Sequence, residues 1–113
     1  MAFLDVNPLA RGHTLVVPKE HHETIGDLPA DLAADLFAAL STLTPTVEAA
    51  VDADASNVAF NNGAVAGQEV PHGHGHIVPR FEGDDGHPIH AIVGSRPDLS
   101  DADLDEVAAA IRD

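Results

Sequence analysis

The stretch His72-Gly73-His74-Gly75-His76, followed by Ile77-Val78-Pro79-Arg80, decides both the fold and the chemistry of this chain. Its residue types predict a strand from His72 to Val78 that Pro79 ends. Because side chains two residues apart along a strand point to the same face, this strand would carry all three imidazoles side by side. Glycine is a poor strand former, so the chain accepts a local cost to keep three polar rings in a row.

A long amphipathic helix is predicted upstream of the triplet. Apolar residues recur at steps of three and four from residue 28 to about residue 51, which is typical of one face of a helix. Asp27 is the predicted N-cap, with Pro29 in the first turn. Pro45 lies inside the pattern and should kink the helix or end it near Leu43.

Shorter apolar stretches predict the remaining elements. Strands are expected over Ala2 to Val6, His13 to Val17 and Asn57 to Asn61, and Ser100 should cap a short C-terminal helix. Strands on both sides of one long helix indicate an α+β domain with a mainly antiparallel sheet. A length of 113 residues suits one domain, 1-113, with an acidic, loop-rich tail from about residue 81.

Charge and composition exclude several classes of protein. Five Lys plus Arg against nineteen Asp plus Glu leave a net charge of −14, which repels nucleic-acid phosphate and anionic membrane surfaces. Without cysteine there is no disulfide, thiolate zinc site or Cys nucleophile. No apolar run approaches the roughly 20 residues of a membrane helix, and no signal peptide is visible, so we expect a soluble, cytoplasmic protein. Such acidity is typical of proteins from a high-salt cytoplasm, whose stability rises with salt.

The triplet alone leaves two chemical interpretations open with similar weight. Histidines two residues apart on a strand can bind zinc, although no carboxylate falls within the triplet and the nearest is Glu69. Neutral imidazole is also a competent nucleophile near pH 7, because its pKa lies close to that pH.

The flanking sequence separates these interpretations. Gly12-His13-Thr14-Leu15-Val16-Val17-Pro18-Lys19 stands upstream, and Gly67-Gln68-Glu69-Val70 precedes the triplet. In this order and spacing the motifs resemble the histidine triad (HIT) family, whose hallmark is His-x-His-x-His followed by two apolar residues. The resemblance runs from Phe3 to about His90. It is greatest with small bacterial and archaeal members, including those similar to nucleoside phosphoramidases and dinucleoside polyphosphate hydrolases.

The resemblance implies a HIT-like fold and a nucleotide hydrolase or transferase. His74 would attack the α-phosphate to give a covalent nucleotidyl-histidine, which water hydrolyses or another phosphate accepts. His76 would assist proton transfer to the leaving group, and His72 and His13 would orient the other two. The family needs no metal or cofactor for this chemistry, and its members form homodimers by joining their sheets.

The resemblance also implies a nucleotide site. Asn61 would lie beside the α-phosphate and Gln68 on the loop facing the leaving group. Asp5 would hold the ribose hydroxyls, and Phe3 and Val6 would line the base pocket.

Two departures from the family pattern leave alternatives open. The spacers within the triplet are usually bulky, and the two glycines here predict a thinner apolar layer behind the strand. Family members also usually begin earlier, so we expect Met1 to be an internal strand residue with its start codon assigned too late. These departures leave a mononucleotide-binding module with little turnover as one alternative. A zinc protein that uses the triplet as ligands is the other. Arg80 next to the triplet is expected to contact ligand or to form a structural salt bridge.

Overall fold

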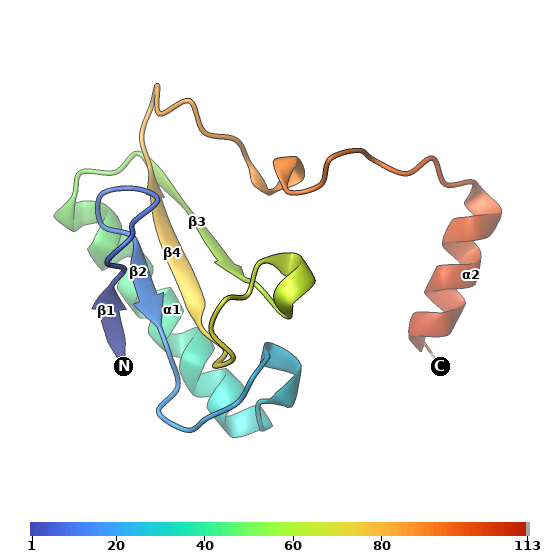
Figure 1. Ribbon diagram of the computed structural model, residues 1–113, viewed down its shortest axis with the longest axis horizontal. Coiled ribbons are helices and arrows are strands. Elements are labelled where there is room, and N and C mark those ends of the chain that lie inside the picture. Colours follow the sequence, from blue (N-terminus) through green and yellow to red (C-terminus); the bar gives the residue numbers. More distant parts are fainter. Residues whose placement is uncertain (113) are drawn as a thin grey trace.

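Four strands form a single sheet in the computed structural model, which describes residues 1–112 (Figure 1). They are β1 (Ala2–Leu4), β2 (Thr14–Val16), β3 (Ala55–Phe60) and β4 (Gly75–Arg80). The spatial order is β1-β2-β4-β3, and every neighbouring pair is antiparallel. This confirms the α+β fold, with strand boundaries that differ from the expected ones by one or a few residues.

The helix α1 (Ala30–Ala50) crosses one face of this sheet and forms the core with it. Leu36 and Leu40, one turn apart, pack against Val16 of β2 and Ile77 of β4. These four side chains are at most 7% exposed, as the apolar repeat along the helix predicts.

Two expectations about α1 were wrong. The N-cap is Pro29 rather than Asp27, because Asp27 lies in a preceding 3-10 turn and caps that turn instead. The helix also continues past Pro45 to residue 50 instead of ending near Leu43. An internal proline removes one backbone hydrogen bond and costs about 3 kcal/mol. Val47, in the turn after it, packs against the core and helps to offset that cost.

Strand β4 begins later than expected, at Gly75 instead of His72. The N–H group of Gly73 donates to the carbonyl oxygen of His22 at 2.7 Å. The backbone before β4 is therefore bound to a loop distant in sequence, and it does not continue the ladder.

Strand β4 also ends later than expected, since it runs through Pro79 to Arg80. Pro79 pairs with Ser56 of β3, but Ile77 is the last residue of β4 that pairs with β2. A proline, which cannot donate a ladder hydrogen bond, is tolerated where a strand has a partner on one side only.

The glycine at position 75 has a packing role. A Cβ atom there would lie 3.0 Å from Cζ of Phe60 and 3.2 Å from both methyl groups of Leu40. These two side chains fill the layer behind the strand, so the expected thinning of the apolar layer is not found. Glycine lets α1 approach β4 closely.

Residues 81–100, which we name the C-terminal arm, leave the sheet and carry α2 (Asp101–Arg112) away from it (Figure 1). Ser100 caps α2 as predicted, since its Oγ accepts from the N–H of Asp103 at 3.1 Å. The radius of gyration is 16.3 Å, against about 13 Å for a compact domain of this length. Three 3-10 helices complete the described elements: η1 (Ile25–Asp27), η2 (Ala64–Ala66) and η3 (Ile89–Ala91).

Within residues 1–112, no helix combines the length and apolar character needed to cross a membrane.

Candidate active site

The open face of the sheet, opposite α1, carries the histidine site. In the antiparallel register His76 of β4 lies opposite Leu15 of β2 and Ala59 of β3. Its neighbour Ile77 is fully buried in the core beneath α1. Because successive side chains of a strand alternate between faces, the imidazole of His76 lies on the face that α1 leaves uncovered.

His13, directly before β2, contacts His76 on this face. The Nε2 atom of His13 lies 3.0 Å from Nδ1 of His76. The other ring nitrogen of His13, Nδ1, accepts a hydrogen bond from the backbone N–H of Leu9 at 3.1 Å. It also lies 3.7 Å from Oδ2 of Asp5. A histidine from outside the triplet is thus a direct neighbour of one of its members.

Burial lowers the pKa of both rings below the ordinary histidine value. For His13, lost hydration is the main cause; the carboxylate of Asp5 raises the pKa and His74 lowers it further. For His76, lost hydration is again the largest effect, followed by repulsion from His74 and His13 and a smaller opposing effect of Asp5. Both rings are therefore neutral near pH 7, with one donor and one acceptor nitrogen each.

His74 lies just before β4, and its ring centroid is 4.8 Å from that of His76. Its Nδ1 atom is 2.7 Å from the backbone carbonyl oxygen of His72. A carbonyl oxygen can only accept, so the proton of the neutral ring is on Nδ1 and Nε2 keeps its lone pair. This is the state that a nucleophilic imidazole requires.

The ring of His72 is turned away from the other two. Its Nε2 donates to the carbonyl oxygen of Pro18 at 2.9 Å, and the ring packs edge-on against His21 with centroids 5.1 Å apart. The expectation of three imidazoles side by side on one strand face is therefore wrong, because β4 begins only at Gly75. The contact of His72 with His74 is made by its backbone carbonyl group.

The three residues near the N-terminus that were expected to contact the nucleotide differ in burial and in their neighbours. Asp5 is partly buried and lies next to His13. Phe3 pairs with Leu15, so it lies on the open face, and it is 45% exposed. Val6 is 90% exposed. The structure brings Asp5 to the histidine pair and leaves Phe3 and Val6 open to solvent.

Asn61 and Gln68 lie in the segment between β3 and β4. Asn61 follows β3 directly and is exposed. Gln68 accepts from the N–H of Gly63 at 2.7 Å and donates to the carbonyl oxygen of Glu23 at 2.6 Å. Its amide therefore ties two loops together, a role that the sequence did not predict. Contact of either residue with a nucleotide stays a prediction.

The three histidines of the triplet do not form a zinc site, because a different group of possible ligands comes together in the structure. Among residues 1–112, the group of three possible ligands within 4.8 Å of one another is Asp5, His13 and His76. Both ring nitrogens of His13 already have hydrogen-bonding partners, on opposite sides of the ring. These residues fit a hydrogen-bonded chain better than a common coordination sphere, in which each ligand directs a free lone pair at one point.

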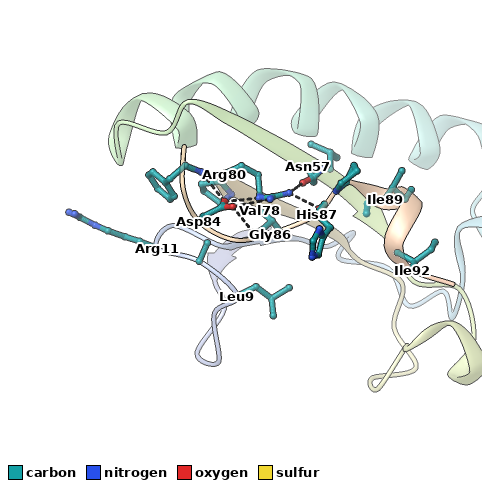
Figure 2. Close-up of a pocket in the computed structure, with 16 residues that line it drawn as sticks. Leu9, Arg11, Asn57, Val78, Arg80, Asp84, Gly86, His87, Ile89 and Ile92 are labelled. Atoms are coloured by element: carbon teal, nitrogen blue, oxygen red, sulfur yellow. Dashed lines mark hydrogen bonds and ion pairs between the residues drawn. The ribbon is translucent and has the colours of Figure 1, made fainter. Parts of the chain in front are cut away.

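A cavity of about 720 Å³ continues the open face beyond His76. Its floor includes Val78, two residues along β4 and so on the same side as His76, and Ala59, which pairs with His76. Ile89 and Ile92 of the C-terminal arm supply apolar side chains to its wall (Figure 2). A mostly apolar cavity of this size suits a small organic group.

Arg80 fastens the C-terminal arm to the sheet. Its guanidinium donates to both carboxylate oxygens of Asp84, at 2.8 and 3.0 Å, and to Oδ1 of Asn57 and the carbonyl of His87, each at 2.8 Å (Figure 2). The hydrogen bond from Arg80 is the main cause that holds the pKa of Asp84 well below its usual range. The salt-bridge interpretation of Arg80 is confirmed.

Sequence reasoning missed two groups near the site. Asp84 stands four residues after Arg80, a spacing that could have indicated the ion pair, but nineteen acidic residues offer many such pairs. The N–H group of Leu9 gave no signal, since every residue except proline has one.

The sequence and the fold of this chain are both similar to those of known proteins. The family model that matches is the HIT domain, over residues 1–83. A solved structure from Streptococcus mutans UA159 superposes with a TM-score of 0.86 at 35% identity, covering 98% of this chain and 68% of that one. An uncharacterised HIT-like protein of Methanocaldococcus jannaschii is 43% identical over 99% of this chain and 81% of its own length.

Two relatives have named activities. An adenylylsulfatase of Arabidopsis thaliana is 38% identical over 74% of this chain and 43% of its own length. An adenosine 5'-monophosphoramidase of Saccharomyces cerevisiae is 38% identical over 70% of this chain and 48% of its own length. This chain thus spans less than half of either enzyme.

Proposed function

The chain belongs to the HIT domain family, and we propose that it cleaves nucleotide conjugates at the α-phosphate through a covalent nucleotidyl-histidine on His74. The observation that carries the proposal is the 2.7 Å hydrogen bond from Nδ1 of His74 to the carbonyl of His72. It leaves the Nε2 lone pair of a neutral imidazole free on the open face of the sheet, next to His76.

In the proposed first step, Nε2 of His74 forms a bond to the α-phosphorus while the bond from phosphorus to the leaving atom breaks. The leaving atom takes up a proton from solvent as that bond breaks, so an amine departs as the neutral molecule. The ring becomes a phosphorylated imidazolium that still carries its proton on Nδ1. The carbonyl of His72 accepts from that N–H, so the hydrogen bond strengthens as positive charge develops.

In the proposed second step, a water oxygen bonds to phosphorus and the bond to Nε2 breaks, which restores neutral His74. Over both steps one water is consumed: its hydroxyl group stays on the nucleotide, and its other proton returns to solvent and replaces the one that the leaving group took up. Asp5, Asn61, Phe3 and Val6 are the residues we propose for the ribose, the α-phosphate and the base.

We assign the leaving group to the cavity bounded by Val78, Ile89 and Ile92. An amine with an apolar substituent fits such walls, whereas a polyphosphate leaving group brings several negative charges that need cations. Two arginines border the cavity. The guanidinium of Arg80 is already taken by Asp84, and the side chain of Arg11 extends away from Ile89 and Ile92 (Figure 2). The chain as a whole carries a charge of −14. These observations, together with the phosphoramidase relative, favour nucleoside phosphoramidates over dinucleoside polyphosphates.

We also propose that the working form is a homodimer. β3 is an edge strand of the sheet, and the apolar residues Leu104, Val107 and Ile111 of α2 are 51%, 52% and 79% exposed. A second copy could cover both features. Light scattering after gel filtration should give twice the 11.7 kDa mass of the chain, and a monomer at micromolar concentration would contradict the dimer.

The experiment that tests the activity is release of amine from a fluorogenic adenosine phosphoramidate. We expect turnover by the natural sequence and loss of at least about a thousandfold in His74→Ala. His90→Ala is the matched control, because His90 is exposed and lies on the C-terminal arm. Circular dichroism checks that each variant folds. A folded natural protein that binds AMP without turning over the phosphoramidate would contradict the proposal and leave a binding module.

A further inference from the structure

We propose that the backbone N–H group of Leu9 is a positioning group of this site, which determines through His13 that His76 presents an N–H, and not a lone pair, beside His74. The kinetic consequence rests on the proposed function. The proton positions do not, because they can be measured on the protein alone.

The inference follows a chain of three hydrogen-bonding groups. A backbone amide can only donate, so the 3.1 Å contact from Leu9 requires a bare Nδ1 on His13. The single proton of the neutral His13 ring is then on Nε2, which lies 3.0 Å from Nδ1 of His76. His13 donates across that contact, so Nδ1 of His76 is also bare. The proton of His76 must therefore be on Nε2.

The two adjacent imidazoles are thus set in opposite senses by two backbone groups. The carbonyl of His72 draws the proton of His74 to Nδ1 and leaves Nε2 bare. The amide of Leu9 acts on His76 through His13 and places its proton on Nε2. With ring centroids 4.8 Å apart, His74 offers a lone pair for attack, and His76 offers a donor to a phosphate oxygen or the leaving atom.

The chain has no place for an additional proton. Protonation of His13 at Nδ1 would break the hydrogen bond from the Leu9 amide. The new N–H group would then have Oδ2 of Asp5, 3.7 Å away, as its nearby acceptor. Burial of the ring, which is 2% exposed, opposes this charged state. Loss of a proton from this pair would leave an imidazolate, so His76 donates a hydrogen bond and keeps its proton. The proton that the leaving atom takes up then comes from solvent, and not from His76 as the family resemblance implies.

The turn that holds Leu9 closes around His13 itself. The N–H of His13 donates to the carbonyl of Ala10 at 3.1 Å, and the N–H of Asp5 donates to the carbonyl of His13 at 2.9 Å. The side chain of Leu9 is 77% exposed. That side chain borders the cavity (Figure 2), but the hydrogen bond to His13 comes from the backbone, so any residue with an N–H group can supply it. Leu9→Pro and Leu9→Ala both remove the leucine side chain and differ in that N–H group.

The test compares Leu9→Pro, which removes the N–H, with Leu9→Ala, which keeps it. Nitrogen NMR of protein labelled at histidine distinguishes the two tautomers of each ring. We expect a proton on Nε2 of His13 and His76 in the natural protein and in Leu9→Ala. In Leu9→Pro both rings should become mixtures, while His74 keeps its proton on Nδ1. The kcat for a phosphoramidate should then be about tenfold lower in Leu9→Pro than in Leu9→Ala.

Two results would overturn the inference: a proton on Nδ1 of His76 in the natural protein, or unchanged tautomers in a folded Leu9→Pro. If Leu9→Pro fails to fold, the spectrum of the natural protein still decides. If the natural protein shows these tautomers but no turnover, the proposed function fails while the assignment of proton positions stands.

Discussion

The Nε2 atom of His13 lies 3.0 Å from the Nδ1 atom of His76, although the two residues are 63 positions apart in sequence. The antiparallel pairing of β2 with β4 produces this contact. It brings together His13, His74 and His76, the cluster that we propose as catalytic, while His72 contacts His74 through its carbonyl group and not through its ring. The triplet motif therefore marks the place of the site without describing its geometry.

His13 and His76 are buried in their neutral form, which predicts that the protein loses stability as the pH falls. Both pKa values are lowered from the ordinary 6.5, so the unfolded chain takes up these protons at higher pH than the folded one. The stabilisation should therefore be present well above pH 6.5, and it should decline as the pH falls through 6.5 and toward the lower pKa values of the folded state. Urea midpoints measured at pH 7.5, 6.5 and 5.5 should decrease in that order.

The matched variants for this prediction are His13→Asn and His90→Ala. The first removes one of the buried titrating groups and should flatten the pH dependence, while the second should keep it. A midpoint that stays constant or rises toward pH 5.5 in the natural protein is the result that contradicts the prediction.

Gly75→Ala should destabilise the fold by about 1–3 kcal/mol, because overpacking a well-filled core forces its neighbours to move. The added methyl group would meet Phe60 at 3.0 Å and Leu40 at 3.2 Å. Gly94→Ala is the control, since a Cβ atom there meets nothing within 4 Å. Urea unfolding measures both, and equal midpoints for the two variants would show that the contact does not limit packing.

The cavity assignment predicts how the C-terminal arm affects substrate choice. The natural protein should prefer an adenosine phosphoramidate of a bulky apolar amine over that of ammonia. The double variant Ile89→Ser with Ile92→Ser should lower this kcat/KM ratio about tenfold, because apolar contact in a pocket is worth roughly that much. Val93→Ser removes an apolar side chain of the same segment that does not line the cavity, and it should keep the ratio. A ratio unaffected by the double variant would place the leaving group elsewhere.

The net charge of −14 predicts stabilisation by salt. The screening length falls from about 10 Å at 0.1 M salt to about 3 Å at 1 M, which reduces repulsion among the carboxylates. Thermal midpoints in KCl should rise mostly below about 0.5 M and then level off. A midpoint independent of KCl would contradict a role for self-repulsion.

Elements set by local patterns could be predicted from the sequence. The apolar repeat of α1 and the cap at Ser100 depend on near neighbours in the chain, and the structure contains both. The end of α1 was missed because packing of Val47 overrides the local effect of Pro45.

Features set by distant partners could not be predicted. The start of β4 depends on a bond between Gly73 and the carbonyl of His22, about fifty residues upstream in the same chain. The orientation of His72 depends on the carbonyl of Pro18. Backbone groups of this kind leave no mark on residue type, which is also why the amide of Leu9 gave no signal.

The most direct test of the central claim is to quench the natural protein during turnover of an adenosine phosphoramidate and locate any adduct by mass spectrometry. The account predicts an adenylyl group on His74, present at early times and lost as AMP accumulates. An adenylyl group on a different residue, or AMP formed with no adduct at any time point, would contradict it.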